Sequence, residues 1–181
     1  MKVLLYAEGL KTIGVSGLGK AIQHQIKALE DEKINYTLNP KDDYDILHIN
    51  TWFVKSYFVA KKAKRKGKKI VYHAHSTEED YKNGFILAKQ TSKLIKWWLI
   101  KCYSLGDIIV TPTLYSKKLL HGYKGLENKK IYAISNGIDM SLFQKDKAAG
   151  ERFRKKYKKY GCNRTCSLDT CRICTNSPIC R

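Results

Sequence analysis

The sequence contains no apolar run that approaches the roughly 18 residues a membrane-spanning helix needs. It also has no cleavage region behind Met1 and Lys2, which lead directly into the apolar run 3–7, so we expect no secretory signal peptide. Residues 1–160 hold a single cysteine, Cys102, and a body of cytosolic character is not expected to form disulfides. These absences predict a cytoplasmic protein that can still touch a membrane from the inside.

Acidic residues are also scarce: 16 Asp and Glu stand against 35 Lys and Arg, and the formal net charge is +19. Such an excess predicts an anionic partner, which can be nucleic acid, an anionic membrane surface or a phosphorylated substrate. Lysine far outnumbers arginine, and lysine acts as a point charge, whereas arginine recognises phosphates and bases in bidentate fashion. We therefore expect an anionic membrane surface and no nucleic acid. A lysine-rich surface that is simply solvated is the alternative.

What the sequence does have is a regular alternation of short apolar runs and helical patterns. A chain of 181 residues can build one α/β domain with a substantial core. The expected strands are residues 2–7, 35–38, 45–50, 69–75, 107–111 and 130–134. The expected helices are residues 19–32, 53–66, 84–104 and 115–122. This alternation predicts a doubly wound, Rossmann-like parallel sheet, in which ligands bind beyond the carboxyl ends of the strands.

A glycine-rich loop, residues 14–20, follows the first expected strand and precedes the first expected helix. Such a loop suits phosphate binding, because its backbone can approach an anion closely and the helix points its first amides at it. The glycine spacing matches neither the phosphate-binding loop of nucleotide hydrolases nor the dinucleotide fingerprint. We expect a phosphate-binding segment here, with a simple βα turn as the alternative. Its residues are Ser16, Gly17, Leu18, Gly19 and Lys20.

Two histidines, His73 and His75, stand near the end of the fourth expected strand. We expect their rings on opposite sides of the strand, so that they do not share a metal ion. His75 is the candidate at the mouth of the cleft, and His73 is a candidate core residue. The acidic run 78–80 is interpreted as solvated carboxylates at a helix start, so no metal site is predicted.

The helical pattern between Lys89 and Cys102 interleaves cations with large apolar side chains. We expect Lys89, Lys93 and Lys96 on one face, with Trp97 and Ile100 on or beside it. The opposite face is expected to carry Leu87, Leu94, Trp98 and Leu99. Lysine interleaved with indole and aliphatic groups is typical of a helix that inserts shallowly beneath anionic headgroups. An ordinary amphipathic helix that covers the sheet is the equally weighted alternative.

The composition changes after Tyr160, because residues 161–181 contain five of the six cysteines and almost no apolar periodicity. The pair Cys171 and Cys174 has the spacing of half a zinc site. We favour unrelated sequence produced by a frameshift or truncation, and keep a zinc-binding tail as the alternative. The expected domains are therefore residues 1–160 and a cysteine-rich tail of residues 161–181.

A second turn, residues 135–139, reads Ser-Asn-Gly-Ile-Asp and follows the last expected strand. Asn-Gly favours positive φ, so a purely structural role is one interpretation. Together with loop 14–20, the acidic stretch after His75 and the Thr-Pro-Thr of residues 111–113, this turn resembles the amino-terminal domain of family 4 retaining glycosyltransferases of the GT-B type. The resemblance covers residues 1 to about 160. Within the family it is similar to the glycolipid synthases of Gram-positive bacteria.

The resemblance implies an enzyme that transfers a hexose from a UDP-sugar to diacylglycerol or a glucosyl-diacylglycerol, without a metal or cofactor. It places His75 against the donor sugar near its phosphate, and residues 16–20 beside the donor diphosphate and the acceptor. Asn136 and Gly137 then close the domain beside the cleft. The family's second domain, which supplies most nucleotide-sugar contacts, has no counterpart in this sequence.

The leading hypothesis is thus an incomplete amino-terminal fragment of a lipid glycosyltransferase on the inner face of the cell membrane. Its expected partners are a UDP-hexose, a membrane lipid acceptor and the anionic membrane surface. We expect no turnover from this chain alone. The alternative is a non-catalytic, basic α/β module with a zinc-binding tail that docks on membrane or nucleic acid. An independent nucleotide-binding enzyme is disfavoured by the missing phosphate-loop pattern.

Overall fold

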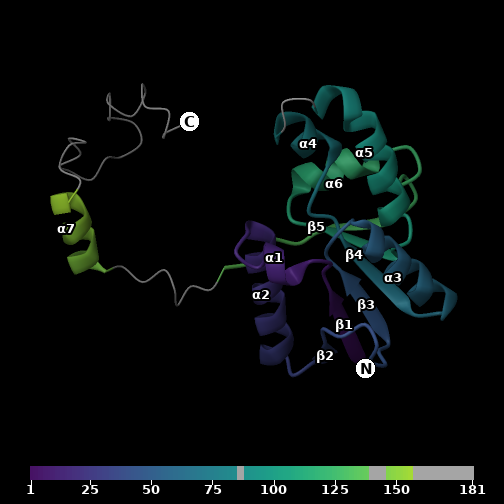
Figure 1. Ribbon diagram of the computed structural model, residues 1–181, viewed down its shortest axis with the longest axis horizontal. Helices are drawn as coiled ribbons and strands as arrows, with labels where there is room; N and C mark the ends of the chain where they lie inside the picture. Colours follow the sequence, from purple (N-terminus) through teal and green to yellow (C-terminus); the bar gives the residue numbers. More distant parts are fainter. Residues whose placement is uncertain (85–87, 139–145, 157–181) are drawn as a thin grey trace. The chain divides into compact units, whose positions relative to one another are not determined.

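A computed structural model describes residues 1–84, 88–138 and 146–156 (Figure 1). The chain divides into two units, Met1–Ile138 and Asp139–Arg181. In the second unit the described part is helix α7, Lys147–Lys156, which has no buried residue. The domain boundary near residue 160 that the sequence predicts stays a prediction. The predicted cysteine tail lies outside the described residues.

The first unit is built on a six-stranded parallel sheet with the strand order β2-β1-β3-β4-β5-β6. All six predicted strands occur, and the predicted α/β fold is confirmed. They are β1 Lys2–Tyr6, β2 Asn35–Thr37, β3 Ile46–Ile49, β4 Lys69–His73, β5 Ile108–Thr111 and β6 Lys130–Ala133. Strands this short and this apolar are typical of a parallel sheet that is covered on its faces.

Helices cover the sheet on both sides in the first unit (Figure 1). They are α1 Leu10–Ile13, α2 Gly17–Asp31, α3 Val54–Arg65, α4 Glu78–Gly84, α5 Ala88–Tyr103 and α6 Leu114–His121. The sequence predicted α2, α3 and α6 within a few residues. The predicted helix 84–104 corresponds to α5, and no separate helix was predicted for α1, α4 or α7. Two predicted helices have side-chain caps, because Ser16 Oγ accepts from Gly19 N (3.2 Å) and Thr113 Oγ1 from Ser116 N (3.0 Å).

The main core lies between the sheet and helices α3, α5 and α6. Leu4, Leu47 and Tyr72 are fully buried there, together with Ala60 of α3 and Leu99 of α5. Each large apolar side chain buried in this way contributes about 1.5–3 kcal/mol of transfer free energy. The next residues along the strands, such as Leu5 and His48, point to the other face because side chains alternate along a strand.

The strand order sets where a ligand can bind. The chain crosses from β1 to β2 in one direction along the sheet and from β3 to β4 in the other, so the order reverses between β1 and β3. In open parallel sheets the crevice outside the carboxyl ends at such a reversal is the usual ligand site. Among the described residues, no helix is both long and apolar enough to cross a bilayer.

Candidate functional site

Polar side chains gather at the carboxyl edge of the sheet, where β3 and β4 end. Asn50 directly follows β3, His73 ends β4, and His75 comes two residues later. Asn50 and His73 are almost fully buried, with 1% and 5% of their surface exposed. His75 is therefore neighboured by buried polar groups.

The imidazole rings of His48, His73 and His75 form one stack. Ring centroids of His48 and His73 lie 5.6 Å apart, those of His73 and His75 lie 4.0 Å apart, and the planes differ by 7° and 11°. The prediction that His73 and His75 point to opposite sides is wrong. Side chains alternate with period two along an extended chain, so residues i and i+2 share a face.

An amide network orients this stack. Gln25 of α2 donates from Nε2 to Asn50 Oδ1 and to His73 Nδ1, both at 3.0 Å. His75 Nε2 lies 3.0 Å from the same Asn50 oxygen, and His48 Nε2 lies 3.4 Å from His73 Nδ1. A carbonyl oxygen can only accept, so His75 carries its proton on Nε2 and keeps a lone pair on Nδ1.

Burial keeps all three imidazoles neutral. Loss of solvation lowers the pKa of His75 to about 4, and loss of solvation together with the His75 charge lowers the pKa of His48 to about 4. The pKa of His73 falls to about 2, chiefly by burial and then by the charges of His75 and His48. At neutral pH the cluster therefore offers hydrogen-bond donors and acceptors of fixed direction and carries no charge.

Three atoms of this network lack a partner in the part of the chain that the structure describes. They are Gln25 Oε1, Asn50 Nδ2 and His73 Nε2, all of them buried. An unpaired buried polar atom costs about 1–3 kcal/mol. Such atoms are rare in folded proteins. A cluster of them at the carboxyl edge of a parallel sheet therefore indicates a functional site.

The two glycine-containing turns lie on either side of α2. Ser16 caps the helix, Gly17 is exposed with open space around its Cα, and Gly19 is buried. Leu18 is half-buried, and Lys20 is exposed and donates from Nζ to Gln23 Oε1 (3.2 Å). The amino end of a 15-residue helix thus stands at the carboxyl edge of the sheet, as an anion site requires.

The second turn is joined to the first through α2. His24 Nδ1 donates to the carbonyl of Gly137 at 3.1 Å, across 113 residues of chain. Gly137 has a φ of 72°, a conformation that favours glycine, and Asn136 is half-buried with an unpartnered Oδ1. Helix α2, which follows residues 14–20, thus contacts Gly137 through His24 and Asn50 through Gln25, and Asn50 in turn contacts His75.

Sequence reasoning missed Gln25, His48 and Asn50 as site residues. Asn50 carried a signal, because it is a polar residue directly after a buried strand at the ligand edge. Gln25 carried a weaker one. It follows the buried Ala21 and Ile22 by four and three residues, so it lies on the face of α2 that meets the sheet.

The residues predicted to contact a membrane do not share one face of α5. Lys93 and Trp97 are exposed, and Lys101 Nζ lies 4.3 Å from the Trp97 ring centroid. Ile100 packs against the core, and the predicted core residue Leu94 is 63% exposed. The side chain of Lys89 lies outside the described residues. The helix is rotated relative to the prediction, because α5 begins later and packs through Ile95, Leu99 and Cys102.

Lys96 and Glu78 were both expected to be solvated, and both expectations are wrong. The Glu78 side chain is only 5% exposed and pairs with Lys82 at 2.8 Å and Lys96 at 3.1 Å. Lys96 Nζ also lies 4.2 Å from the ring centroid of Tyr123, whose hydroxyl accepts from the Glu78 amide. These contacts anchor α4 to α5, so Lys96 has a structural role.

The described residues contain no group of three or more His, Cys, Asp or Glu side chains arranged to hold a metal ion. The stacked imidazoles explain this for the histidines, since parallel rings do not point their nitrogens at one centre. The tail cysteines lie outside the described residues, and zinc binding there stays a prediction.

Comparison with known proteins agrees with this geometry. The family model for glycosyltransferase family 4 matches residues 22–142. The chain is also 34% identical over 157 residues to a processive diacylglycerol alpha-glucosyltransferase of Acholeplasma laidlawii. That match covers 87% of this chain and 46% of the relative, so the chain spans about half the length of the curated relative. The resemblance inferred from the turns is confirmed, and the chain belongs to glycosyltransferase family 4.

Proposed function

We propose that this chain is the amino-terminal, acceptor-side half of a retaining glycosyltransferase that transfers a hexose from a UDP-sugar to diacylglycerol or glucosyl-diacylglycerol. The observation that carries the proposal is the 34% identity to a diacylglycerol glucosyltransferase along 87% of this chain. The crevice at the reversal of strand order supports it, because that is where such a sheet binds ligands.

In this proposal His75 contacts the donor sugar as a neutral hydrogen-bonding group. Its pKa of about 4 keeps the ring uncharged at pH 7. Its protonated Nε2 donates a hydrogen bond to Asn50 Oδ1. Nδ1 is then the atom that accepts a hydrogen bond from a sugar hydroxyl. The buried Asn50 keeps the ring in one orientation, so the donor meets a preorganised partner.

The departing diphosphate is placed at the amino end of α2. Backbone amides of residues 17 and 18 and the positive end of the helix dipole favour an anion there. Cations of a second domain complete the stabilisation of the leaving group, so the proposal includes no metal or cofactor. The acceptor hydroxyl enters from the lipid side, beside the turn at residues 135–137.

The proposal is tested by joining this chain to the carboxyl-terminal half of the Acholeplasma laidlawii relative. Such a chimera should release UDP from a UDP-hexose in the presence of diacylglycerol vesicles, whereas the chain alone should not. His75→Ala should lower kcat of the chimera by about 10²–10³, the usual effect of removing one preorganised hydrogen-bonding group.

His121→Ala is the matched control, since His121 is exposed on α6 and belongs to none of the segments placed in the site. It should leave kcat unchanged. Lipid-dependent UDP release by the unjoined chain would contradict the fragment proposal. A chimera that tolerates His75→Ala would remove His75 from the site.

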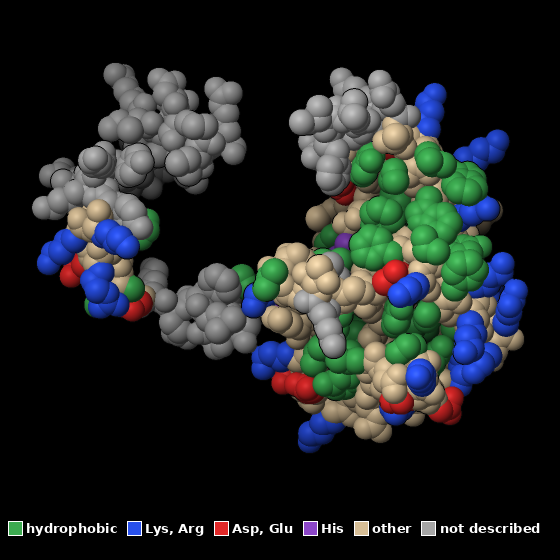
Figure 2. Space-filling view, in the orientation of Figure 1, with side chains coloured by type: hydrophobic (Ala, Val, Ile, Leu, Met, Phe, Trp, Pro, Cys, Tyr) green, Lys and Arg blue, Asp and Glu red, His purple; other side chains and the backbone are tan. Residues whose placement is uncertain are grey.

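Membrane attachment is proposed to use α5 together with the first turns of α3. Hydrophobic side chains gather over these helices, with lysines around them (Figure 2). Trp97 of α5 is 51% exposed and Phe58 of α3 is 60% exposed. Between the two helices, the ring centroids of Tyr57 and Trp98 lie 5.2 Å apart. Exposed aromatic groups beside lysines suit the headgroup region of an anionic bilayer on the inner face of the membrane.

Vesicles that contain anionic lipid should therefore bind the chain, shift the Trp97 emission to shorter wavelength and release the chain as salt is raised. Lys93→Glu with Lys101→Glu should weaken this binding, since each lysine near the surface contributes about 1 kcal/mol. Lys96 is left intact because it holds Glu78. Lys118→Glu with Lys124→Glu, two positions elsewhere on the chain, is the control. Equal loss in both double variants would show that binding reflects net charge alone.

A further inference from the structure

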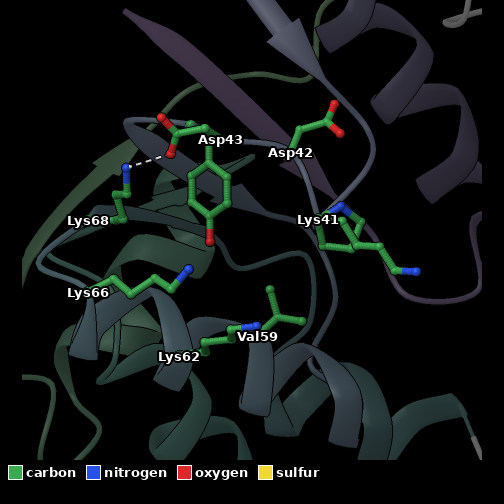
Figure 3. Close-up of a pocket in the computed structure, with 9 residues that line it drawn as sticks. Lys41, Asp42, Asp43, Val59, Lys62, Lys66 and Lys68 are labelled. Carbon is green, nitrogen blue, oxygen red and sulfur yellow. Dashed lines mark hydrogen bonds and ion pairs between the residues drawn. The ribbon is translucent and has the colours of Figure 1, made fainter.

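A pocket of about 390 Å³ lies at the opposite edge of the sheet from the cleft (Figure 3). It is formed by the segment before β3, by α3 and by the turn that leads into β4. Its lining residues are Pro40, Lys41, Asp42, Asp43, Tyr44, Val59, Lys62, Lys66 and Lys68. These segments precede β3 and β4, whereas Asn50 and His75 follow them. The pocket is therefore separate from the proposed donor site.

Both carboxylates of the pocket are already occupied. Asp43 pairs with Lys68 at 3.1 Å, and hydrogen bonding to that ammonium group lowers the Asp43 pKa, so the carboxylate stays ionised. Asp42 accepts from the Thr37 hydroxyl at 2.5 Å and from Asn39 Nδ2 at 2.8 Å. Asp42 also lies 3.9 Å from Lys2 Nζ, so neither carboxylate forms an ion pair with Lys41, Lys62 or Lys66.

Three lysines of the pocket make no ion pair with any residue that the structure describes. Lys62 and Lys66 lie one turn apart at the end of α3, Lys62 shares a face with Val59, and Lys41 comes from the facing segment. In Figure 3 the side chain of Lys66 extends into the pocket, toward the side from which Lys41 comes. In the same view the side chain of Lys41 extends away from Lys66, so Lys62 and Lys66 of α3 are the unpaired cations on one side of the pocket and Lys41 lies at its rim.

The charge balance favours an anion despite the helix dipole. The carboxyl end of α3 brings about half a negative charge to this end of the helix. Four ammonium groups against two carboxylates outweigh it. The ring of Tyr44, which is 8% exposed, and the side chains of Val59 and Pro40 add an apolar wall. A hollow with cations and an apolar wall suits an anionic group attached to an organic body.

We propose that this pocket binds the phosphate group of a phosphate ester, either a soluble ester or the headgroup of an anionic lipid. Lys62 and Lys66 contact the phosphate oxygens, Lys41 adds positive charge at the rim, and Tyr44 and Val59 contact the organic part. Lysine suits this task because its three donors rotate and reach a phosphate from several directions. The site lies apart from the sugar-transfer cleft and does not depend on the proposed function.

The test is a titration of the full isotope-labelled chain with inorganic phosphate and with glycerol 3-phosphate, followed by NMR at constant ionic strength. Saturable shifts are expected at the amides of residues 41–44, 66 and 68. Lys62→Gln with Lys66→Gln should weaken binding at least tenfold. The control, Lys64→Gln with Arg65→Gln, removes the same charge from the same helix outside the pocket and should change affinity less than twofold.

Vesicles of phosphatidylglycerol, compared with phosphatidylcholine, distinguish the two sources of phosphate. Saturation by glycerol 3-phosphate in the pocket identifies a soluble ester, and pocket shifts that occur only with phosphatidylglycerol vesicles identify a lipid headgroup. The proposal is overturned by shifts that spread over all lysine-bearing surfaces without saturation, or by equal loss in the two double variants. Melting temperatures within a few degrees of the parent chain exclude unfolding as the cause.

Discussion

The carboxyl and amino edges of the sheet differ in the burial and the charge of their polar side chains. At the carboxyl edge Asn50 and His73 are buried and His75 is half-buried, and these neutral groups are connected through Asn50 and Gln25 by hydrogen bonds at 3.0 Å. At the amino edge, where the pocket lies, Lys41, Lys62 and Lys66 are exposed to solvent. Buried neutral groups select a ligand by the direction of hydrogen bonds, whereas solvated cations attract any anion of suitable size.

The largest expected effect concerns pH. The folded pKa of His48 and of His75 is about 4, below the ordinary value of about 6.5, so the unfolded chain binds more protons between these values. The free energy of unfolding should therefore fall as the pH drops from 6.5 to 4, on the order of 1–3 kcal/mol per histidine. Denaturant unfolding at a series of pH values measures this slope.

His48→Gln sharpens that comparison, because it removes one of the buried imidazoles and should make the slope between pH 6.5 and 4 shallower. The amino edge should behave differently. The pKa of Asp43 is lowered from an already acidic value, so its contribution is lost only at lower pH. A slope that His48→Gln leaves unchanged would place the titrating groups elsewhere.

A smaller effect is expected from Asn50→Ala. The change leaves Gln25 Nε2 and His75 Nε2 without the oxygen that they share, which should lower the free energy of unfolding by about 1–3 kcal/mol. It should also release the His75 ring, and the change in its tautomer is visible in imidazole ¹⁵N chemical shifts. Asn50→Asp keeps an acceptor oxygen and should retain the Nε2-protonated tautomer.

The smallest expected effect is the matched change at the other edge. Lys68→Met breaks the exposed pair with Asp43 and keeps the length of the side chain. Exposed pairs contribute about 0–1 kcal/mol, so stability should change by less than 1 kcal/mol. A larger loss from Lys68→Met than from Asn50→Ala would contradict the distinction between the two edges.

Much of this architecture could be predicted from local patterns. The apolar runs at residues 2–7 and 107–111 became β1 and β5, and the turns at 14–20 and 135–137 lie where the ligand edge requires them. The histidine pair was located correctly, but its geometry was wrong because the alternation of side chains was misapplied. Helix α4 was missed because seven polar residues with three acids carry no apolar stripe.

The residues that complete the site depended on contacts between distant segments. Gln25 reaches Asn50 across 25 positions and His73 across 48, and Lys96 finds Glu78 from a different helix. Patterns in a single sequence indicate only neighbours within one helix or strand. They therefore predict that Gln25 and Lys96 are exposed, and they do not identify the partners of these residues.

The sequence by itself determined the order of strands and helices, the excess of positive charge and the turns that mark the family. These follow from periodicity, composition and glycine conformation, which act within a few residues of chain. Only the tertiary structure decided that Glu78 is buried, that three imidazoles stack and stay neutral, and that lysines from α3 and the segment before β3 share a pocket. Burial and pairing depend on which segments of the chain come into contact, and the packing of the helices against the sheet determines those contacts.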